Sequence, residues 1–187
     1  LECLEKRGKL KNVFGITFRE KRGIISTPDR PLIKDIGTLP FPDRSLLGEY
    51  HATIAGAYTA PKKFTSILSS RGCVFKCRFC GAQRLAQGIW RPRSVENTIE
   101  EIRLLVSKGY KQFLFVDDNF TLDPKRVIKL CQSIRKEKMD IEWFFEGRVD
   151  RCSYEMLREA VKAGCRIIIL GVESANQRIL DYYNKGI

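Results

Sequence analysis

From residue 64 onward, short apolar runs alternate with amphipathic helical segments, and this alternation limits the possible folds more than any other feature. The apolar runs cover residues 64–69, 113–116, 141–145 and 167–170. Apolar strands separated by helices are typical of parallel sheets with right-handed crossovers. We therefore expect an α/β fold, either a doubly wound sheet or a partial βα barrel of about four βα units, too few to close a barrel.

Residues with capping side chains mark the expected helix starts. Ser94, Asp123 and Ser153 each precede a helical pattern and can accept hydrogen bonds from its first free amides. Gly109 and Gly164 follow two of these patterns and suit helix ends. A last helix is expected over residues 176–183, so that one helix follows each strand.

The beginning of the chain has a different character. Residues 13–18 and 23–26 are two β-prone runs joined by a polar turn, which predicts a β-hairpin. Five of the seven prolines then fall between residues 28 and 61, a density that predicts an extended linker. Because a lone hairpin is not stable by itself, we expect residues 1–27 to be the tail of an N-terminal domain, residues 28–62 a linker and residues 63–187 an incomplete core domain. Leu1 is not an initiator methionine, which also suggests a piece of a longer protein.

Polar side chains follow the ends of all four expected strands. In parallel α/β folds, ligands bind at the carboxyl ends of the strands. Packing alone does not explain a polar residue at each strand end, so we take these residues as candidates for a binding site. They are Cys73, Cys77, Cys80, Asp117, Asp118, Arg148 and Glu173.

Three cysteines after the first strand have a CxxxCxxC spacing, at Cys73, Cys77 and Cys80. Three thiolates can hold three irons of a cubane cluster and leave the fourth iron open for chemistry, whereas a structural zinc site is closed by four ligands. The zinc alternative requires a distant fourth ligand, for which the candidates are His51, Cys131, Cys152 and Cys165.

The cysteine spacing, with the aromatic Phe79 just before the last cysteine, resembles the radical S-adenosylmethionine (SAM) superfamily over residues 63–187. Residues 115–120 and 171–174 resemble the second-strand and fourth-strand motifs of its cobalamin-dependent branch, and residues 33–42 resemble the linker of that branch. The resemblance implies a 4Fe-4S cluster, SAM and cobalamin, the last bound by the domain to which residues 1–27 belong. Two departures are the absence of a DxHxxG cobalamin motif and an acidic segment at 115–120 in place of a glycine-rich GGE.

The resemblance also implies roles for the strand-end residues. The amino and carboxylate groups of SAM would occupy the open iron, and one electron would break SAM into methionine and a 5'-deoxyadenosyl radical. Asp117 and Asp118 would accept hydrogen bonds from the methionine ammonium, and Arg148 would pair with its carboxylate. The alternatives are that these acids cap the following loop and that the arginine balances nearby acids.

The fourth-strand motif and the cysteine loop supply the remaining implied contacts. Glu173 would accept hydrogen bonds from the ribose hydroxyls or the ammonium, with Ser174 beside it, and Phe79 would present its backbone to adenine. The alternative for Glu173 and Ser174 is a cap on the last helix.

The leading functional hypothesis is a cytoplasmic radical SAM enzyme that methylates or rearranges a small molecule and receives electrons from a flavodoxin-like or ferredoxin-like donor. The net charge of +12 leaves a second hypothesis open, a tRNA-modifying enzyme similar to methylthiotransferases. A third hypothesis is a metal or electron-carrier domain without enzymatic activity. No apolar run approaches the roughly eighteen residues of a membrane span, and we expect none.

Overall fold

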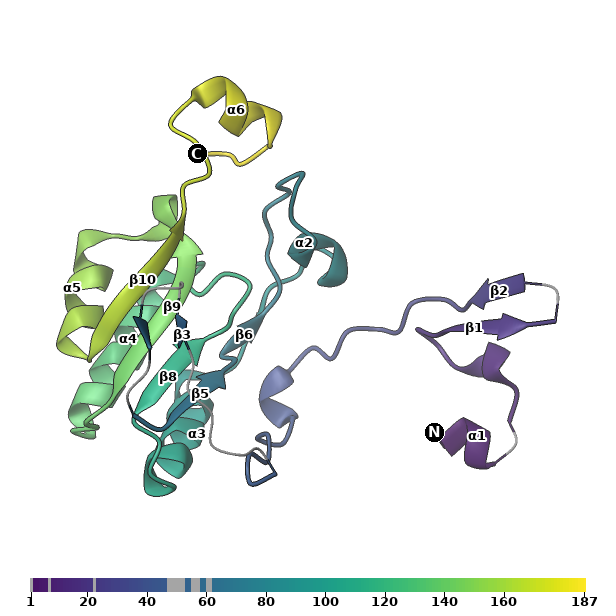
Figure 1. The fold of residues 1–187 in the computed structure, drawn as a ribbon, viewed down its shortest axis with the longest axis horizontal. Coiled ribbons are helices and arrows are strands. Elements are labelled where there is room, and N and C mark those ends of the chain that lie inside the picture. Colours follow the sequence, from purple (N-terminus) through teal and green to yellow (C-terminus); the bar gives the residue numbers. More distant parts are fainter. Residues whose placement is uncertain (1, 7, 22, 47–52, 55–57, 60–61) are drawn as a thin grey trace. The chain divides into compact units, whose positions relative to one another are not determined.

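The computed structural model describes residues 2–6, 8–21, 23–46, 53–54, 58–59 and 62–187 (Figure 1). The chain divides into two compact units, Leu1–Lys34 and Asp35–Ile187. The first unit contains α1 (Glu2–Glu5), the 3-10 helix η1 (Leu10–Asn12) and an antiparallel hairpin of β1 (Thr17–Glu20) and β2 (Gly23–Ser26). A hairpin was expected here, and its second strand has the expected bounds, whereas the first strand lies at Thr17–Glu20 instead of residues 13–18.

A four-stranded parallel sheet forms the centre of the second unit. Its order is β10-β9-β8-β5, so each strand pairs with the next one along the chain. The strands are β5 (Phe64–Ile67), β8 (Gln112–Phe115), β9 (Glu142–Arg148) and β10 (Cys165–Gly171). This order is that of a partial βα barrel, which confirms the predicted fold class and excludes the doubly wound alternative.

The helices follow the strands as the capping residues predicted. They are α3 (Val95–Ser107), α4 (Pro124–Lys136), α5 (Tyr154–Lys162) and α6 (Gln177–Tyr182). The side chains of Ser94, Asp123 and Ser153 each accept a hydrogen bond from the backbone amide three residues later. Helices α3, α4 and α5 cover one face of the sheet, seen in Figure 1.

Apolar side chains fill the space between this face and the helices. Phe115, Phe120, Trp143 and Phe145 are buried there, with neighbouring ring centroids 4.7–5.8 Å apart. A separate apolar cluster contains Phe64 and Phe144, with Leu114, Ile167 and Ile169 packed against it. Because side chains alternate along a strand, this second cluster belongs to the opposite face of the sheet, the inner face of the partial barrel.

Short elements complete the second unit. They are the 3-10 helices η2 (Ile36–Thr38) and η3 (Val149–Arg151), helix α2 (Ala82–Leu85), and the antiparallel pairs of β3 (Thr53–Ile54) with β4 (Tyr58–Thr59) and β6 (Ser70–Arg71) with β7 (Arg91–Pro92). Within the part of the chain that is described, no helix combines the length and apolarity needed to cross a bilayer.

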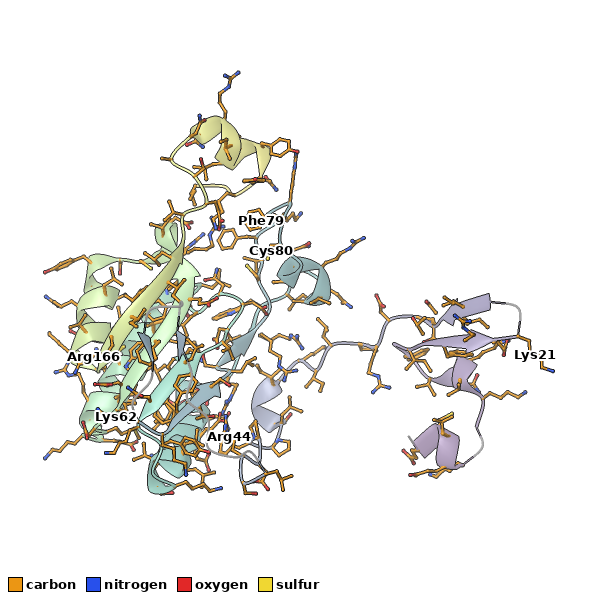
Figure 2. All side chains as sticks on the ribbon, viewed as in Figure 1. Lys21, Arg44, Lys62, Phe79, Cys80 and Arg166 are labelled. Carbon is orange, nitrogen blue, oxygen red and sulfur yellow. The ribbon has the colours of Figure 1, made fainter. Side chains whose placement is uncertain are left out.

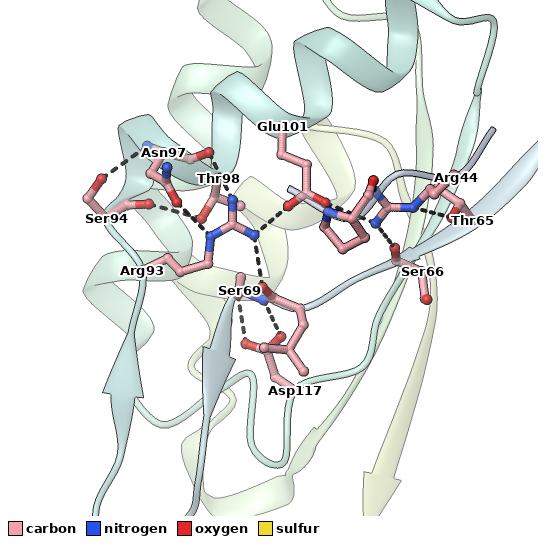
Figure 3. A network of polar contacts seen from close by, with 12 residues as sticks. Arg44, Thr65, Ser66, Ser69, Arg93, Ser94, Asn97, Thr98, Glu101 and Asp117 are labelled. Atoms are coloured by element: carbon pink, nitrogen blue, oxygen red, sulfur yellow. Dashed lines mark hydrogen bonds and ion pairs between the residues drawn. The ribbon is translucent and has the colours of Figure 1, made fainter. Parts of the chain in front are cut away.

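Arg44, labelled in Figure 2, joins residues 35–46 to β5 and α3 through a buried charge network (Figure 3). Arg44 is 8% exposed, and its guanidinium donates to Thr65 Oγ1 at 2.9 Å and to Glu101 Oε1 at 2.9 Å. Arg93 pairs with the other oxygen of Glu101, which is 1% exposed. Part of the stretch expected as linker, residues 35–46, therefore lies within the second unit, and the domain assignment of residues 1–27 and 28–62 stays a prediction.

Glu101→Gln is expected to destabilise this unit, because it leaves two buried guanidinium groups without their carboxylate. Breaking a buried ion pair from one side typically costs about 3–5 kcal/mol of the free energy of unfolding. Chemical denaturation of the variant measures this loss. Glu100→Gln, a change at the exposed neighbouring position of α3, is the matched control and should stay within about 0.5 kcal/mol. Equal stability of the two variants would contradict the structural role of Glu101.

Candidate functional site

The cysteine loop leaves β6 through Gly72, where the backbone has a φ of +92°. A Cβ atom at this position would lie 2.1 Å from the carbonyl oxygen of Ile89 and 2.7 Å from Ala86 Cβ. The amide of Gly72 donates to Asp118 Oδ2 at 2.6 Å. Only glycine fits this turn, and the carboxylate after β8 fixes its orientation.

Asp117 supports the start of the loop from below (Figure 3). Its carboxylate accepts from the amide of Ser69 at 2.7 Å, from Ser69 Oγ at 2.7 Å and from Ser70 Oγ. Burial raises the pKa of Asp117, and these hydrogen bonds and Arg126 oppose that rise. Asp117 does not line the pocket described next. Its carboxylate is bonded to Ser69 and Ser70 of the protein instead.

A pocket of about 260 Å³ opens at the carboxyl ends of β8, β9 and β10. It brings together most of the residues that the sequence singled out. Of these, the pocket is lined by Cys73, Cys77, Cys80, Phe79, Asp118, Arg148 and Glu173. Asn119 and Lys185, for which the sequence pattern predicted no role, line it as well.

The three cysteines of the loop are free thiols, with Cys73 buried and Cys80 exposed. Their sulfurs surround the pocket but do not form one coordination sphere, since no group of three or more His, Cys, Asp or Glu side chains in the described ranges is close enough to hold a metal ion. The donor set of three thiols at one pocket matches a cluster with one open iron.

The cysteines proposed as a fourth zinc ligand lie elsewhere. Cys131 and Cys165 belong to the main core, and burial raises the pKa of each to about 12, so both stay protonated at neutral pH. Burial also raises the pKa of Cys152, whose Sγ contacts the carbonyl oxygen of Arg148. His51 lies outside the described residues.

Glu173 reaches the pocket from the end of β10 in a left-handed backbone conformation, with a φ of +65°. Its Oε1 accepts a hydrogen bond from Lys185 Nζ at 2.9 Å, and the lysine side chain is 5% exposed. A non-glycine residue at positive φ is strained, a feature that clusters at functional sites. Ser174 does not line the pocket, and its Oγ accepts from the amide of Asn176 at 3.0 Å.

Asn119 carries an unsatisfied donor beside the pocket. Thr121 Oγ1 accepts from the amide of Arg148 at 3.1 Å, so its one hydroxyl proton is free to donate to Asn119 Oδ1 at 3.1 Å. This contact orients the amide group and leaves Asn119 Nδ2 buried, without a hydrogen-bond partner among the described residues. A buried unpaired donor is costly unless a ligand accepts from it. The one sequence feature that could have indicated a role for Asn119 is its position directly after Asp117 and Asp118.

The segment after α6 braces the outer side of the cysteine loop. The amide of Arg78 donates to the carbonyl oxygen of Tyr183 at 2.8 Å, and Asn184 Nδ2 donates to that of Lys76 at 2.9 Å. Phe79 packs edge-on against Tyr183 with ring centroids 5.4 Å apart. Phe79 and Cys80 are labelled in Figure 2. The loop is therefore also held by a segment more than 100 residues further along the chain.

The chain is similar in sequence to known proteins. Residues 67–187 match the family model of the Radical SAM superfamily. The uncharacterized methyltransferase PH0819 of Pyrococcus horikoshii is 34% identical over 188 residues, an alignment that covers 100% of this chain and 40% of the relative. The chain thus spans less than half the length of that relative.

Two solved structures share the arrangement of the chain. The radical S-adenosylmethionine methyltransferase TsrM from Kitasatospora setae, with cobalamin and a 4Fe-4S cluster bound, gives a TM-score of 0.72 at 16% identity over 97% of this chain and 37% of that one. The apo cobalamin-dependent S-adenosylmethionine radical enzyme OxsB gives 0.69 at 25% identity over 100% of this chain and 28% of that one. At 16% identity, the likeness to TsrM concerns the fold alone.

Gly72→Ala is expected to disrupt the cysteine loop, because the added methyl collides with the backbone of Ile89. Gly81→Ala is the matched control, since nothing lies within 4 Å of a Cβ at that position, at the other end of the loop. Thermal denaturation should show a lower Tm for the first variant and a Tm near wild type for the second. A wild-type Tm for Gly72→Ala would show that the loop tolerates another backbone path.

Proposed function

Because the chain belongs to the radical SAM superfamily, we propose that it contributes part of the catalytic barrel of an enzyme that cleaves SAM reductively. The family match over residues 67–187 confirms the superfamily and the enzyme class expected from the cysteine loop. The reaction, the cofactors and the roles of individual residues form the proposal, since the chain spans only 40% of the first relative.

The observation that carries the proposal is the position of three free cysteines around one pocket at the carboxyl ends of parallel strands. Cys73, Cys77 and Cys80 would hold three irons of a 4Fe-4S cluster. When bound, such a cluster supplies the single electron for cleavage of the sulfonium C–S bond. The protein contributes the shape and the charge of the pocket.

Three polar side chains of the pocket are suited to the amino acid and ribose groups of SAM. Asp118 and Glu173 are acceptors for the ammonium or the ribose hydroxyls, and Asn119 Nδ2 is a donor for a carboxylate or hydroxyl oxygen. Phe79 lies at the rim, 51% exposed, where its backbone can meet adenine. The contacts of Asp117 with Ser69 and Ser70 support the start of the cysteine loop, a role different both from contact with SAM and from capping of the loop that follows Asp117.

We assign the whole protein to cobalamin-dependent methyl transfer or rearrangement on a small molecule, with a flavodoxin-like or ferredoxin-like electron donor. This finer proposal is supported by the similarity to PH0819, named as an uncharacterized methyltransferase, and to OxsB, a cobalamin-dependent enzyme. The net charge of +12 is the one observation that favours tRNA as substrate instead. Salt-dependent tRNA binding by the full-length protein, with methylthiolated tRNA as product, would replace the small-molecule assignment.

Replacing any one of Cys73, Cys77 and Cys80 with serine is expected to abolish stable cluster binding in the full-length protein, because serine is a poor iron ligand. Iron content and visible absorption after anaerobic reconstitution measure this, and 5'-deoxyadenosine should disappear together with the cluster. Cys3→Ser, in the other compact unit, is the control and should retain the cluster. Wild-type iron content in any of the three loop variants would contradict the proposed ligand set.

Asn119→Ala should weaken the binding of SAM about tenfold, the loss expected for one hydrogen bond of about 1.4 kcal/mol. Iron content should not change, because Asn119 does not contact the cysteine loop in any hydrogen bond of the described structure. Equilibrium binding of SAM to the reconstituted full-length protein measures the effect. An unchanged dissociation constant would remove Asn119 from the binding site.

A further inference from the structure

Arg148, at the end of β9, is the residue where three parts of the site meet. Its side chain is buried, 6% exposed, and its Nε donates to Asp150 Oδ1 at 2.9 Å. Its Nη2 donates to the carbonyl oxygen of Lys185 at 2.8 Å, beyond α6. Its Cζ lies 3.7 Å from the centroid of the Phe75 ring, inside the cysteine loop. One guanidinium thus joins β9, the loop and the segment after α6.

The same guanidinium contacts one of the three cysteines directly. Arg148 Nη1 lies 3.7 Å from Cys77 Sγ, within the range of a hydrogen bond to sulfur. A positively charged donor stabilises negative charge on a thiolate. Hydrogen bonds to cluster sulfurs are one of the protein's means of setting a reduction potential.

Protein groups contact the guanidinium of Arg148 on several sides. The cation–π contact fixes one face against Phe75, and the edge is used by Asp150, Cys77 and Lys185. A carboxylate of SAM, the partner expected from the sequence, would have to compete with these contacts. The contacts of Arg148 are therefore better suited to holding the shape of the cysteine loop than to binding SAM.

We propose that Arg148 is a positioning residue that holds the cysteine loop in its cluster-binding shape and donates to Cys77 sulfur. The proposal rests on the proposed function for the part that concerns the cluster, whereas the bracing of the loop is a property of the protein without it. Arg148 therefore has two separable effects, on the mobility of the loop and on the properties of the cluster.

Arg151 offers a matched control on the same structure. Its Cζ lies 5.3 Å from the same Phe75 ring and its Nε lies 3.6 Å from Asp150 Oδ2, but its side chain is 44% exposed. Within the described part of the chain it makes no hydrogen bond to Cys77 or to the segment after α6. Arg151→Ala therefore removes a similar charge and a longer contact to Phe75, but leaves the hydrogen bonds of Arg148 to Cys77 and Lys185 in place.

The first measurement is amide hydrogen exchange of the cluster-free, reduced full-length protein. Arg148→Ala should speed exchange in the loop around the amide of Arg78 at least tenfold, while amides of β9 and β10 keep their protection as an internal check on folding. Arg148→Lys, which keeps the charge but not the planar fork, should give an intermediate rate, and Arg151→Ala a wild-type rate. Loop exchange that is equal in all four proteins would overturn the bracing role.

The second measurement is made after anaerobic reconstitution with iron and sulfide. Arg148→Ala should lower the affinity for the cluster on the order of tenfold and shift its midpoint potential to a more negative value, because a cationic donor to sulfur is lost. An unchanged potential and iron content with weaker SAM binding would identify Arg148 as a cofactor contact and overturn the proposal. Absence of a cluster in the wild-type protein would refute the proposed function instead, and loop exchange would still decide the bracing role.

Discussion

The site depends on the burial of a few charged side chains beneath the cysteine loop. Asp117 accepts hydrogen bonds from Ser69 and Ser70 just before the loop begins, and Arg126 donates to the carbonyl oxygen of Ser69 at 2.9 Å. Burial lowers the pKa of Arg126, whereas the nearby Asp117 acts in the opposite direction. Buried charges are tolerated only when they are paired and hydrogen-bonded, so this arrangement gives the loop one fixed point of departure from the sheet.

Asp117 and Asp118, adjacent acids just after β8, have different surroundings. Asp117 is turned toward Ser69 and is buried, whereas Asp118 faces the pocket and holds the amide of Gly72. Both acids therefore hold the start of the cysteine loop, and of the two only Asp118 also lines the pocket.

The pocket is completed by residues that come late in the chain. Glu173, Lys185 and the segment around Tyr183 approach the cysteine loop from β10 and α6. The shape of the loop therefore depends on contacts with residues of the fourth βα unit. Arg148 connects this late segment to the loop, which explains why an arginine buried at the end of a strand has protein partners on several sides.

The sequence by itself determined the parallel four-strand fold, the helix starts at Ser94, Asp123 and Ser153, and the edge of the sheet at which the polar residues gather. These features follow from local rules, namely the period of apolar residues and the capping of free amides, which are readable along the chain.

Only the tertiary structure decided which groups each strand-end residue contacts. In the folded protein Asp117 is bonded to Ser69 at the start of the loop, and Arg148 is bonded to Lys185. Asn119 and Lys185, for which the sequence predicted no role, line the pocket. The reason is physical: these contacts join residues far apart in the sequence, 37 positions for Arg148 and Lys185, 48 for Asp117 and Ser69, and 108 for Asn184 and Lys76. No local pattern encodes such contacts.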